Sequence, residues 1–330
     1  MTTLRDIAAH FGLSDSTVSR ILNGKGRASA DTRSRVLEYA KQVHYHPNLL
    51  AKSLKNQQSN TIGVLLPDIT NEYYALLFKA IEDRMRQHGL MAILFNSGEV
   101  QEREEAFLEY LYSAQIDGMI IATSGAPAYA TLASELIERI VFVDNRPLAG
   151  SREVDYVGSD NVASSFLLTE HLINRGYGRI ATLVGSLSES SAQERLEGFR
   201  SALSNHSIPQ RDEWIVGTNF LYADGVAKAL ELLSAKERPN AVIAQNNVLA
   251  YAAIRVAKSL GVEVPGDLAV CCFDHVDVYG FMRPVITSVV QPISLIAAAA
   301  SDAWLARRAD PSRPALYRLF SAEFRLGETT

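Results

Sequence analysis

Apolar residues recur at helical spacing within residues 1–46 and predict three short helices. The second helix covers Asp15–Leu22, and only a short break containing Gly12 separates it from the first. That spacing is typical of a helix-turn-helix. The third helix begins after Ser29, a good N-cap, and we expect it to stop before Pro47. The pattern therefore predicts an N-terminal all-α helix-turn-helix head.

From Thr61 onward the pattern changes to short, continuous apolar runs that alternate with amphipathic stretches. Continuous apolar runs are expected of parallel strands that helices cover on both faces. The candidate strands are Ile62–Leu66, Ala92–Asn96, Gly118–Ala122, Ile140–Val143, Arg179–Val184, Ala241–Ala244, Leu268–Phe273 and Val285–Val290, with a further short strand near Val216. This alternation predicts an α/β body with parallel sheets. Because about 270 residues are many for one sheet, we expect two similar lobes.

Charge is distributed unevenly along the chain. The whole chain has 37 acidic and 32 basic residues, a net charge of −5. Within residues 1–60, however, lysine and arginine outnumber aspartate and glutamate, so the acidic excess belongs to the remainder. A short basic segment on an acidic body is the asymmetry expected when only the head contacts nucleic-acid phosphates.

Composition bounds the remaining possibilities. Hydrophobic residues make up 47% of the chain, enough for a large core. No apolar run reaches the roughly 20 residues of a membrane helix, and the N-terminus lacks the apolar region of a signal peptide. We therefore expect a cytoplasmic protein without a membrane partner. The adjacent Cys271 and Cys272 lie in an apolar run and are expected to be buried thiols. The sequence indicates no cofactor and no metal site.

The second helix carries the residues suited to base recognition. Its N-terminal residues would face outward, as in a helix that enters the major groove. Arg20 can donate two hydrogen bonds to guanine, and Asp15 can accept one from cytosine. Hydroxyl groups suit phosphates. A solvated face of a small helical bundle is the alternative interpretation. The DNA-binding residues predicted in the head are Thr3, Asp15, Ser16, Thr17, Ser19, Arg20 and Asn23.

These motifs resemble a known family. The run LRDIAAHFGLSDSTVSRILNG and the later segments TIGVLLPDITNEYY, VFVDNRP, HLINRGYGRIA, AVIAQNN and FDHVDV occur in the order found in lactose-repressor/galactose-repressor (LacI/GalR) regulators. The resemblance implies a transcriptional repressor that binds a pseudo-palindromic, double-stranded operator as a homodimer. It also implies a hinge helix in which Leu54 enters the minor groove while Lys52 and Lys55 contact phosphates.

The resemblance also implies how the body is organised. It predicts a two-lobed, periplasmic-binding-protein-like domain with a small effector between the lobes. We expect the head at residues 1–46, the hinge and linker at 47–60, and the effector-binding and dimerisation domain at 61–330. Within that domain the N-lobe would take about 61–160 plus 292–320, and the C-lobe about 161–291.

Ligands of such sheets bind beyond the carboxyl ends of the strands. Polar and aromatic residues follow most of the candidate strands, and they match effector-contact positions of the family. They are Asn71, Tyr73, Tyr74, Asp144, Asn145, Arg146, Ser191, Arg195, Phe220, Asn246, Asn247, Asp274 and Gln291. Asp274 and Arg195 are expected to meet in the cleft, where a carboxylate and a guanidinium can share vicinal hydroxyls, and Phe220 would cover an apolar ring face. Any one of these residues could instead simply cap a loop or a helix.

Two positions depart from the family pattern. Asn247 stands where many members have Asp, which puts a hydroxyl contact there in doubt, and Glu189 stands where the purine-binding branch is often basic. We therefore favour a sugar or sugar phosphate as the effector.

A sugar receptor without DNA function and a Rossmann-like enzyme are the rival interpretations. The basic head argues against the first, and the lack of phosphate-loop, nucleophile-elbow and zinc motifs argues against the second. No leucine heptad follows Phe324, so a dimer is expected rather than a tetramer.

Overall fold

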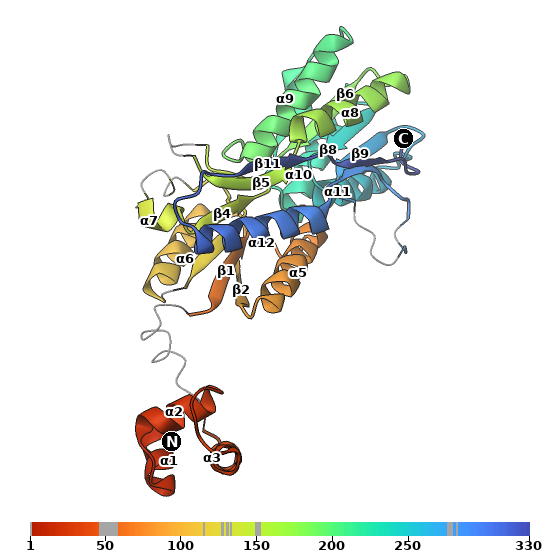
Figure 1. Cartoon of the computed structure of the whole chain (residues 1–330). Coiled ribbons are helices and arrows are strands. Elements are labelled where there is room, and N and C mark those ends of the chain that lie inside the picture. Colours follow the sequence, from red (N-terminus) through yellow and green to blue (C-terminus); the bar gives the residue numbers. More distant parts are fainter. Residues whose placement is uncertain are drawn as a thin grey trace. The chain divides into compact units, whose positions relative to one another are not determined.

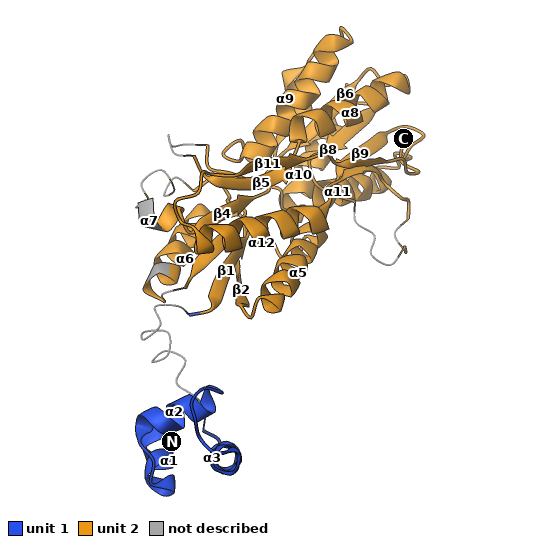
Figure 2. Ribbon diagram, viewed as in Figure 1, with its two compact units in different colours: residues 1–59 blue, residues 60–330 orange. Residues whose placement is uncertain are grey.

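The computed structural model describes residues 2–45, 59–114, 116–126, 129, 132, 134–148, 153–275, 280–281 and 283–330. The chain divides into two compact units, Met1–Ser59 and Asn60–Thr330 (Figure 2). We call them the head and the body. No helix among the described residues is long and apolar enough to cross a membrane.

The head contains helices α1 (Leu4–Phe11), α2 (Asp15–Leu22) and α3 (Ala30–Gln42). Side chains from all three helices form its core, among them Ile7, Val18 and Val36. Gly12 ends α1 in a left-handed conformation, which glycine adopts without steric cost. This confirms the helix-turn-helix. The third helix ends earlier than predicted, because the chain turns through a left-handed residue at His44.

The body contains two six-stranded sheets (Figure 1). The first has the order β11-β5-β4-β3-β1-β2, and we call it, with its helices, the N-lobe. Its pairs are all parallel. Its strands are β1 (Thr61–Leu66), β2 (Met91–Asn96), β3 (Gly118–Ile121), β4 (Ile140–Val143), β5 (Asp155–Ser159) and β11 (Tyr317–Phe320). Its helices are α5 (Glu72–Gln87), α6 (Gln101–Ser113), α7 (Ser134–Ile137) and α12 (Ile293–Ala309).

The second sheet has the order β12-β10-β9-β8-β6-β7 and belongs to the C-lobe. Only its edge strand β12 is antiparallel. Its strands are β6 (Ile180–Val184), β7 (Ile215–Gly217), β8 (Ala241–Ala244), β9 (Ala269–Phe273), β10 (Thr287–Val290) and β12 (Glu323–Arg325). Its helices are α8 (Asn161–Asn174), α9 (Ser190–Asn205), η2 (Asp212–Trp214), α10 (Tyr222–Leu233) and α11 (Asn247–Ser259).

The chain passes between the lobes three times: after β5, after β10 and after β11. Figure 1 shows the result for α12, which comes late in the sequence but packs beside α5 in the N-lobe. Each lobe has its own apolar core, and the central strands β3, β4, β8 and β9 are buried along their whole length. Parallel pairing directs the carboxyl ends of neighbouring strands to the same edge, where the polar residues described next are found.

Three strands were not predicted from the hydrophobic pattern. β5 mixes polar and apolar residues, and β11 and β12 are largely exposed edge strands. Both features weaken the continuous apolar signal that marked the other strands. The predicted fold class is nevertheless confirmed: a helical head precedes two α/β lobes with parallel sheets.

Candidate functional site

Helix α2 presents a polar face to solvent. Val18 and Ile21 are buried in the head core, whereas Asp15, Ser16 and Arg20 are exposed. Asp15 lies in the first turn of α2 and Arg20 in the last turn, and a carboxylate and a guanidinium on one exposed helix face can both reach base edges.

The other predicted head residues have local partners. The Thr17 hydroxyl lies 2.8 Å from that of Ser14, the N-cap of α2, and Asn23 Nδ2 donates to the Ser19 carbonyl at 2.7 Å. Thr3 forms a capping box with Asp6 at the start of α1. Lys52, Leu54 and Lys55 lie outside the described residues.

Arg5 was not predicted as part of this surface. Its Nε lies 3.4 Å from Asp15 Oδ2, and both side chains are more than half exposed. The pair joins the start of α1 to the start of α2. The hydrophobic pattern could not reveal it, because exposed charges carry no periodicity signal.

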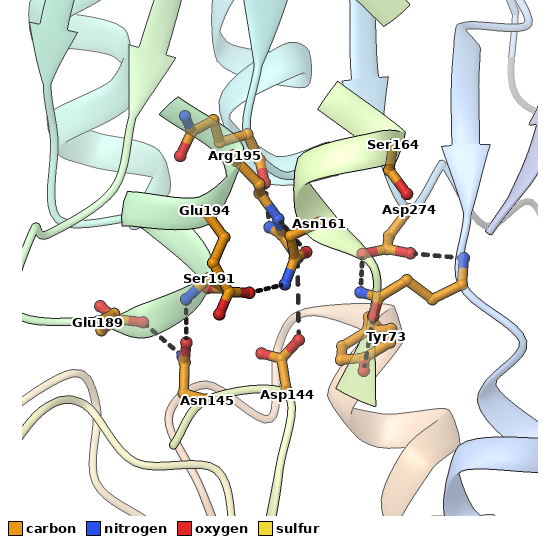
Figure 3. Close-up of polar contacts among 12 residues, drawn as sticks. Tyr73, Asp144, Asn145, Asn161, Ser164, Glu189, Ser191, Glu194, Arg195 and Asp274 are labelled. Atoms are coloured by element: carbon orange, nitrogen blue, oxygen red, sulfur yellow. Dashed lines mark hydrogen bonds and ion pairs between the residues drawn. The ribbon is translucent and has the colours of Figure 1, made fainter. Parts of the chain in front are cut away.

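In the body, Arg195 on α9 lies at the centre of a buried polar network (Figure 3). Its Nε donates to Asn161 Oδ1 at 2.8 Å, and its Nη1 donates to the Gln245 carbonyl. Its Nη2 lies 3.8 Å from Asp144 Oδ1, and both side chains are only 5% exposed. The guanidinium also stacks over the ring of Phe273, 4.2 Å from the centroid. Arg195 is therefore held rigidly and joins the C-lobe to the carboxylate that follows β4 in the N-lobe.

A second group of contacts surrounds Asp274, which follows β9. Gln291 donates to both carboxylate oxygens, through its backbone N at 3.1 Å and its Nε2 at 2.7 Å. The Tyr73 hydroxyl lies 3.5 Å from Gln291 Oε1. Burial raises the pKa of Asp274 to about 6, although Arg195 and Gln291 oppose that rise. The sequence predicted that Asp274 and Arg195 meet. The positive charge of Arg195 lowers the pKa of Asp274, but the two side chains have different hydrogen-bond partners.

Asn145 and Arg146, which follow Asp144, connect the N-lobe to the start of α9. Asn145 Nδ2 donates to Glu189 Oε2 at 2.7 Å, and its Oδ1 accepts from the backbone N of Ser191 at 2.9 Å. Figure 3 shows Asn145 directed at both residues. Arg146 forms an ion pair with Glu194 at 3.2 Å. These bonds cross from one lobe to the other, so each would break or lengthen if the lobes separated.

Four residues at this edge have a left-handed backbone although none is glycine: Glu99 (φ 60°), Asp144 (59°), Phe220 (62°) and Asp274 (59°). Asp adopts this region more readily than most residues, but for Phe it is uncommon. Strained backbone of this kind often marks functional sites. Here it turns each residue sharply at or just beyond the end of a strand.

Several predicted residues have visible structural roles. Asn71 and Asn246 cap α5 and α11, each accepting a backbone N–H through its side-chain oxygen. The Phe220 ring lies in the C-lobe core, where Gly185 leaves space for it: a Cβ on Gly185 would come within 1.8 Å of the ring.

Asn247 forms a contact between the lobes, and Tyr74 forms one within the N-lobe. Asn247 Nδ2 donates to Glu72 Oε2 across the lobes at 2.6 Å. The Tyr74 hydroxyl donates to Asp144 Oδ2 at 2.7 Å, and burial raises its pKa well above the ordinary value.

Comparisons with known proteins decide the family. Residues 3–48 match the family described as bacterial regulatory proteins, lacI family. Residues 59–306 match the one described as periplasmic binding proteins and sugar binding domain of LacI family. The chain belongs to the LacI family. This LacI-family protein is a DNA-binding transcriptional repressor with a periplasmic-binding-protein-like effector domain, and it is not an enzyme.

Similar proteins support this assignment over most of their length. The HTH-type transcriptional regulator DegA of Bacillus subtilis is 33% identical over 297 residues, covering 88% of this chain and 87% of DegA. A ribose operon repressor of Halalkalibacterium halodurans is 32% identical over 296 residues, covering 89% and 86%. The solved structure of a complex of the transcriptional regulator CelR with cellobiose is 27% identical, covers 100% of both chains and superposes with a TM-score of 0.73.

Several residues of this LacI-family site were missed from sequence. Asn161 and Gln245 contact Arg195 directly, and Glu194 accepts from Asn161 Nδ2 at 3.0 Å. Gln245 follows β8 immediately, so the strand-end rule could have found it. Glu99 lies in the loop after β2, where the same rule applies, but its buried environment is visible only in the fold. No group of three or more His, Cys, Asp or Glu side chains in the described part of the chain is arranged to hold a metal ion.

Proposed function

We propose that this repressor is controlled by a sugar-class effector that binds between the lobes. The sequence favours a sugar or sugar phosphate. The observation that carries the proposal is the buried arrangement of Arg195 between Asp144, Asn161 and the Phe273 ring. A fixed guanidinium beside a carboxylate offers donors and acceptors to neighbouring hydroxyls, and the similar regulator CelR was solved with cellobiose.

The proposed effector contacts are the predicted residues that converge here, chiefly Asp144, Arg195 and Asp274, with Asn161 and Gln245 added. Asn71, Asn246 and Phe220 would support the site by fixing its loops. Tyr73 and Gln291 would position Asp274, since Gln291 bonds both of its oxygens.

On the DNA side, we propose that Arg20 and Asp15 contact bases and that Ser16, Ser19 and Thr17 serve phosphates or local packing. Leu54 would act in the minor groove, with Lys52 and Lys55 on the phosphates. Because a repressor must reach operator DNA, we propose that the protein acts in the cytoplasm.

We further propose a homodimer. β2 is an edge strand of the N-lobe sheet, and its Met91 is 62% exposed, while Tyr110 on the neighbouring helix α6 is 56% exposed. An exposed apolar edge strand is a surface that proteins usually cover. Pairing two N-lobes would also bring two hinge segments, and hence two heads, to one palindromic operator.

Regulation would follow from a difference in effector affinity between two lobe arrangements. A coupling of about 1–3 kcal/mol is enough for useful control. Because several side-chain bonds cross the lobes, an effector that adds bonds to both would favour the closed arrangement.

The test is operator affinity with and without each of a panel of sugars and sugar phosphates, measured by fluorescence anisotropy. Asp274→Asn is expected to abolish the effector response while operator binding without effector stays near wild type. Glu231→Gln, an exposed change on α10, is the control. A full response of Asp274→Asn at wild-type effector concentrations would show that the site is wrongly assigned.

A further inference from the structure

The interlobe site contains more carboxyl groups than cations. Asp144, Glu189, Glu194, Asp274 and Arg195 lie around it (Figure 3), and Arg146 is paired with Glu194. Glu99 lies close enough to Asp144 and Glu189 to interact with their charges. Asp274 is held by Gln291. Within the described residues, Glu99 and Glu189 form no ion pair with a basic side chain. We call Glu99, Asp144 and Glu189 the carboxyl cluster.

Several buried polar atoms at this site lack a hydrogen-bond partner among the described residues. They include Glu99 Oε2, Asp144 Oδ1 and both amide atoms of Gln245, a side chain that is 0% exposed. Gln245 is joined to the cluster through Arg195, which binds its carbonyl and faces Asp144. Buried polar atoms are nearly always satisfied, so several unpartnered ones in one network indicate groups that are available to a ligand.

The cluster spans both lobes and is held in position by neutral groups. Asn145 Nδ2 fixes Glu189 at 2.7 Å and the Tyr74 hydroxyl fixes Asp144 at 2.7 Å, while the Ser124 side chain near Glu99 lowers the pKa of that carboxyl. Glu99 and Asp144 come from the N-lobe and Glu189 from the C-lobe. A ligand cation bound by all three would therefore hold the lobes together.

We propose that the carboxyl cluster binds a protonated amine of the effector, so that the effector is an amino sugar or a similar hydroxylated amine. This rests on the proposed function, because the same interlobe site must bind the effector. Arg195, Asn161 and Asp274 would bind the hydroxyl groups, and the amine would lie toward Glu99 and Glu189. A phosphate in the same place would meet three carboxyl groups, which repel it whenever they ionise, and is therefore disfavoured.

The protonation of the cluster supports this assignment. Burial, with Asp144, Asp68 and Glu104 nearby, raises the pKa of Glu99 to about 8. Burial also raises the pKa of Glu189 well above its ordinary value; Glu99 and Asp144 add to the rise, and Asn145 and Arg195 oppose it. Without a cation the cluster therefore retains protons at neutral pH. An amine that binds there displaces a proton, so its affinity should increase as pH rises from 6 to 8, whereas a neutral sugar gains nothing.

The test uses the full chain and matched compounds that differ only in charge. Thermal shift and isothermal titration calorimetry are run with glucosamine, glucose and glucose 6-phosphate, with the galactose equivalents, and with 2-amino-1,3-propanediol, glycerol and glycerol 3-phosphate at constant ionic strength. Amines are expected to raise the Tm of the body most and to release protons, seen as a buffer-dependent binding heat. Glu189→Gln and Glu99→Gln should each weaken amine binding at least tenfold, while Glu197→Gln, exposed on α9, should not.

The inference is overturned if no amine shifts the Tm, if the neutral or phosphorylated partner binds as well as its amine, or if both glutamine variants bind amines as wild type does. A neutral sugar that changes operator affinity through Asp274 would overturn the amine assignment and leave the proposed function standing. An amine that binds through Glu189 but leaves operator affinity unchanged would support the amine site and overturn the proposed function.

Discussion

The head and the body keep their charged candidate residues in opposite environments. In the head, Arg20, Asp15 and Arg5 are exposed, and both side chains of the Arg5–Asp15 pair are more than half exposed. In the body, Arg195 and Asp144 are 5% exposed and have several fixed partners. Exposed pairs contribute little to stability, whereas breaking a buried pair leaves an uncompensated charge. Substitutions in the head should therefore change DNA affinity, and those in the body should change stability as well.

The largest expected effect is that of Arg195→Ala. It removes the donors to Asn161 and Gln245 and leaves Asp144 buried beside an apolar gap. Loss of one partner of a buried pair costs about 3–5 kcal/mol, which lowers the Tm of the body on the order of 10 °C. Differential scanning calorimetry measures it, with Arg200→Ala, exposed on the same helix, as control. Equal Tm values for the two variants would show that the buried charges of the body contribute no more to stability than exposed ones do.

Arg20→Ala comes next and should act on affinity alone. If Arg20 donates to a guanine, its loss costs about 1–3 kcal/mol of binding to the operator and much less on random DNA. The Tm of the head should remain close to wild type, because the side chain is exposed. The measurement is a binding titration of wild type and Arg20→Ala on operator DNA and on random DNA. A loss of the same size on random DNA would mean that Arg20 contacts phosphate instead.

The smallest effect concerns pH. Because Glu99 keeps its proton in the folded state up to a pKa of about 8, and loses it near 4.5 when unfolded, its contribution favours folding at low pH and is lost as pH rises through 8. Glu99→Gln should therefore reduce the fall in body Tm between pH 5 and 8 by a few degrees. Glu102→Gln, exposed nearby on α6, is the control. An unchanged slope would indicate that Glu99 is ionised in the fold.

Much of the candidate site could be located from sequence, because parallel strands bring their carboxyl ends to one edge. Asp144, Asp274 and Gln291 were found in this way, each following a clear apolar run. The position of a residue after a strand could not show whether its side chain contacts a ligand or caps the following helix. Asn246 follows β8 as expected, but both of its amide atoms are used, one to cap α11 and one to hold the Phe220 carbonyl.

The sequence by itself determined the helix-turn-helix and the central strands, since both depend on spacing over a few residues: caps, helical periodicity and short apolar runs. Only the tertiary structure decided which side chains become partners across the lobes. Arg195 meets Asp144 from 51 positions away, and Asn145 meets Glu189 from 44. Burial of these charges, and the pKa shifts that follow, depend on how the two lobes, each with its own apolar core, pack against one another. No local pattern encodes that arrangement, because the desolvation of a charge is a property of everything packed around it.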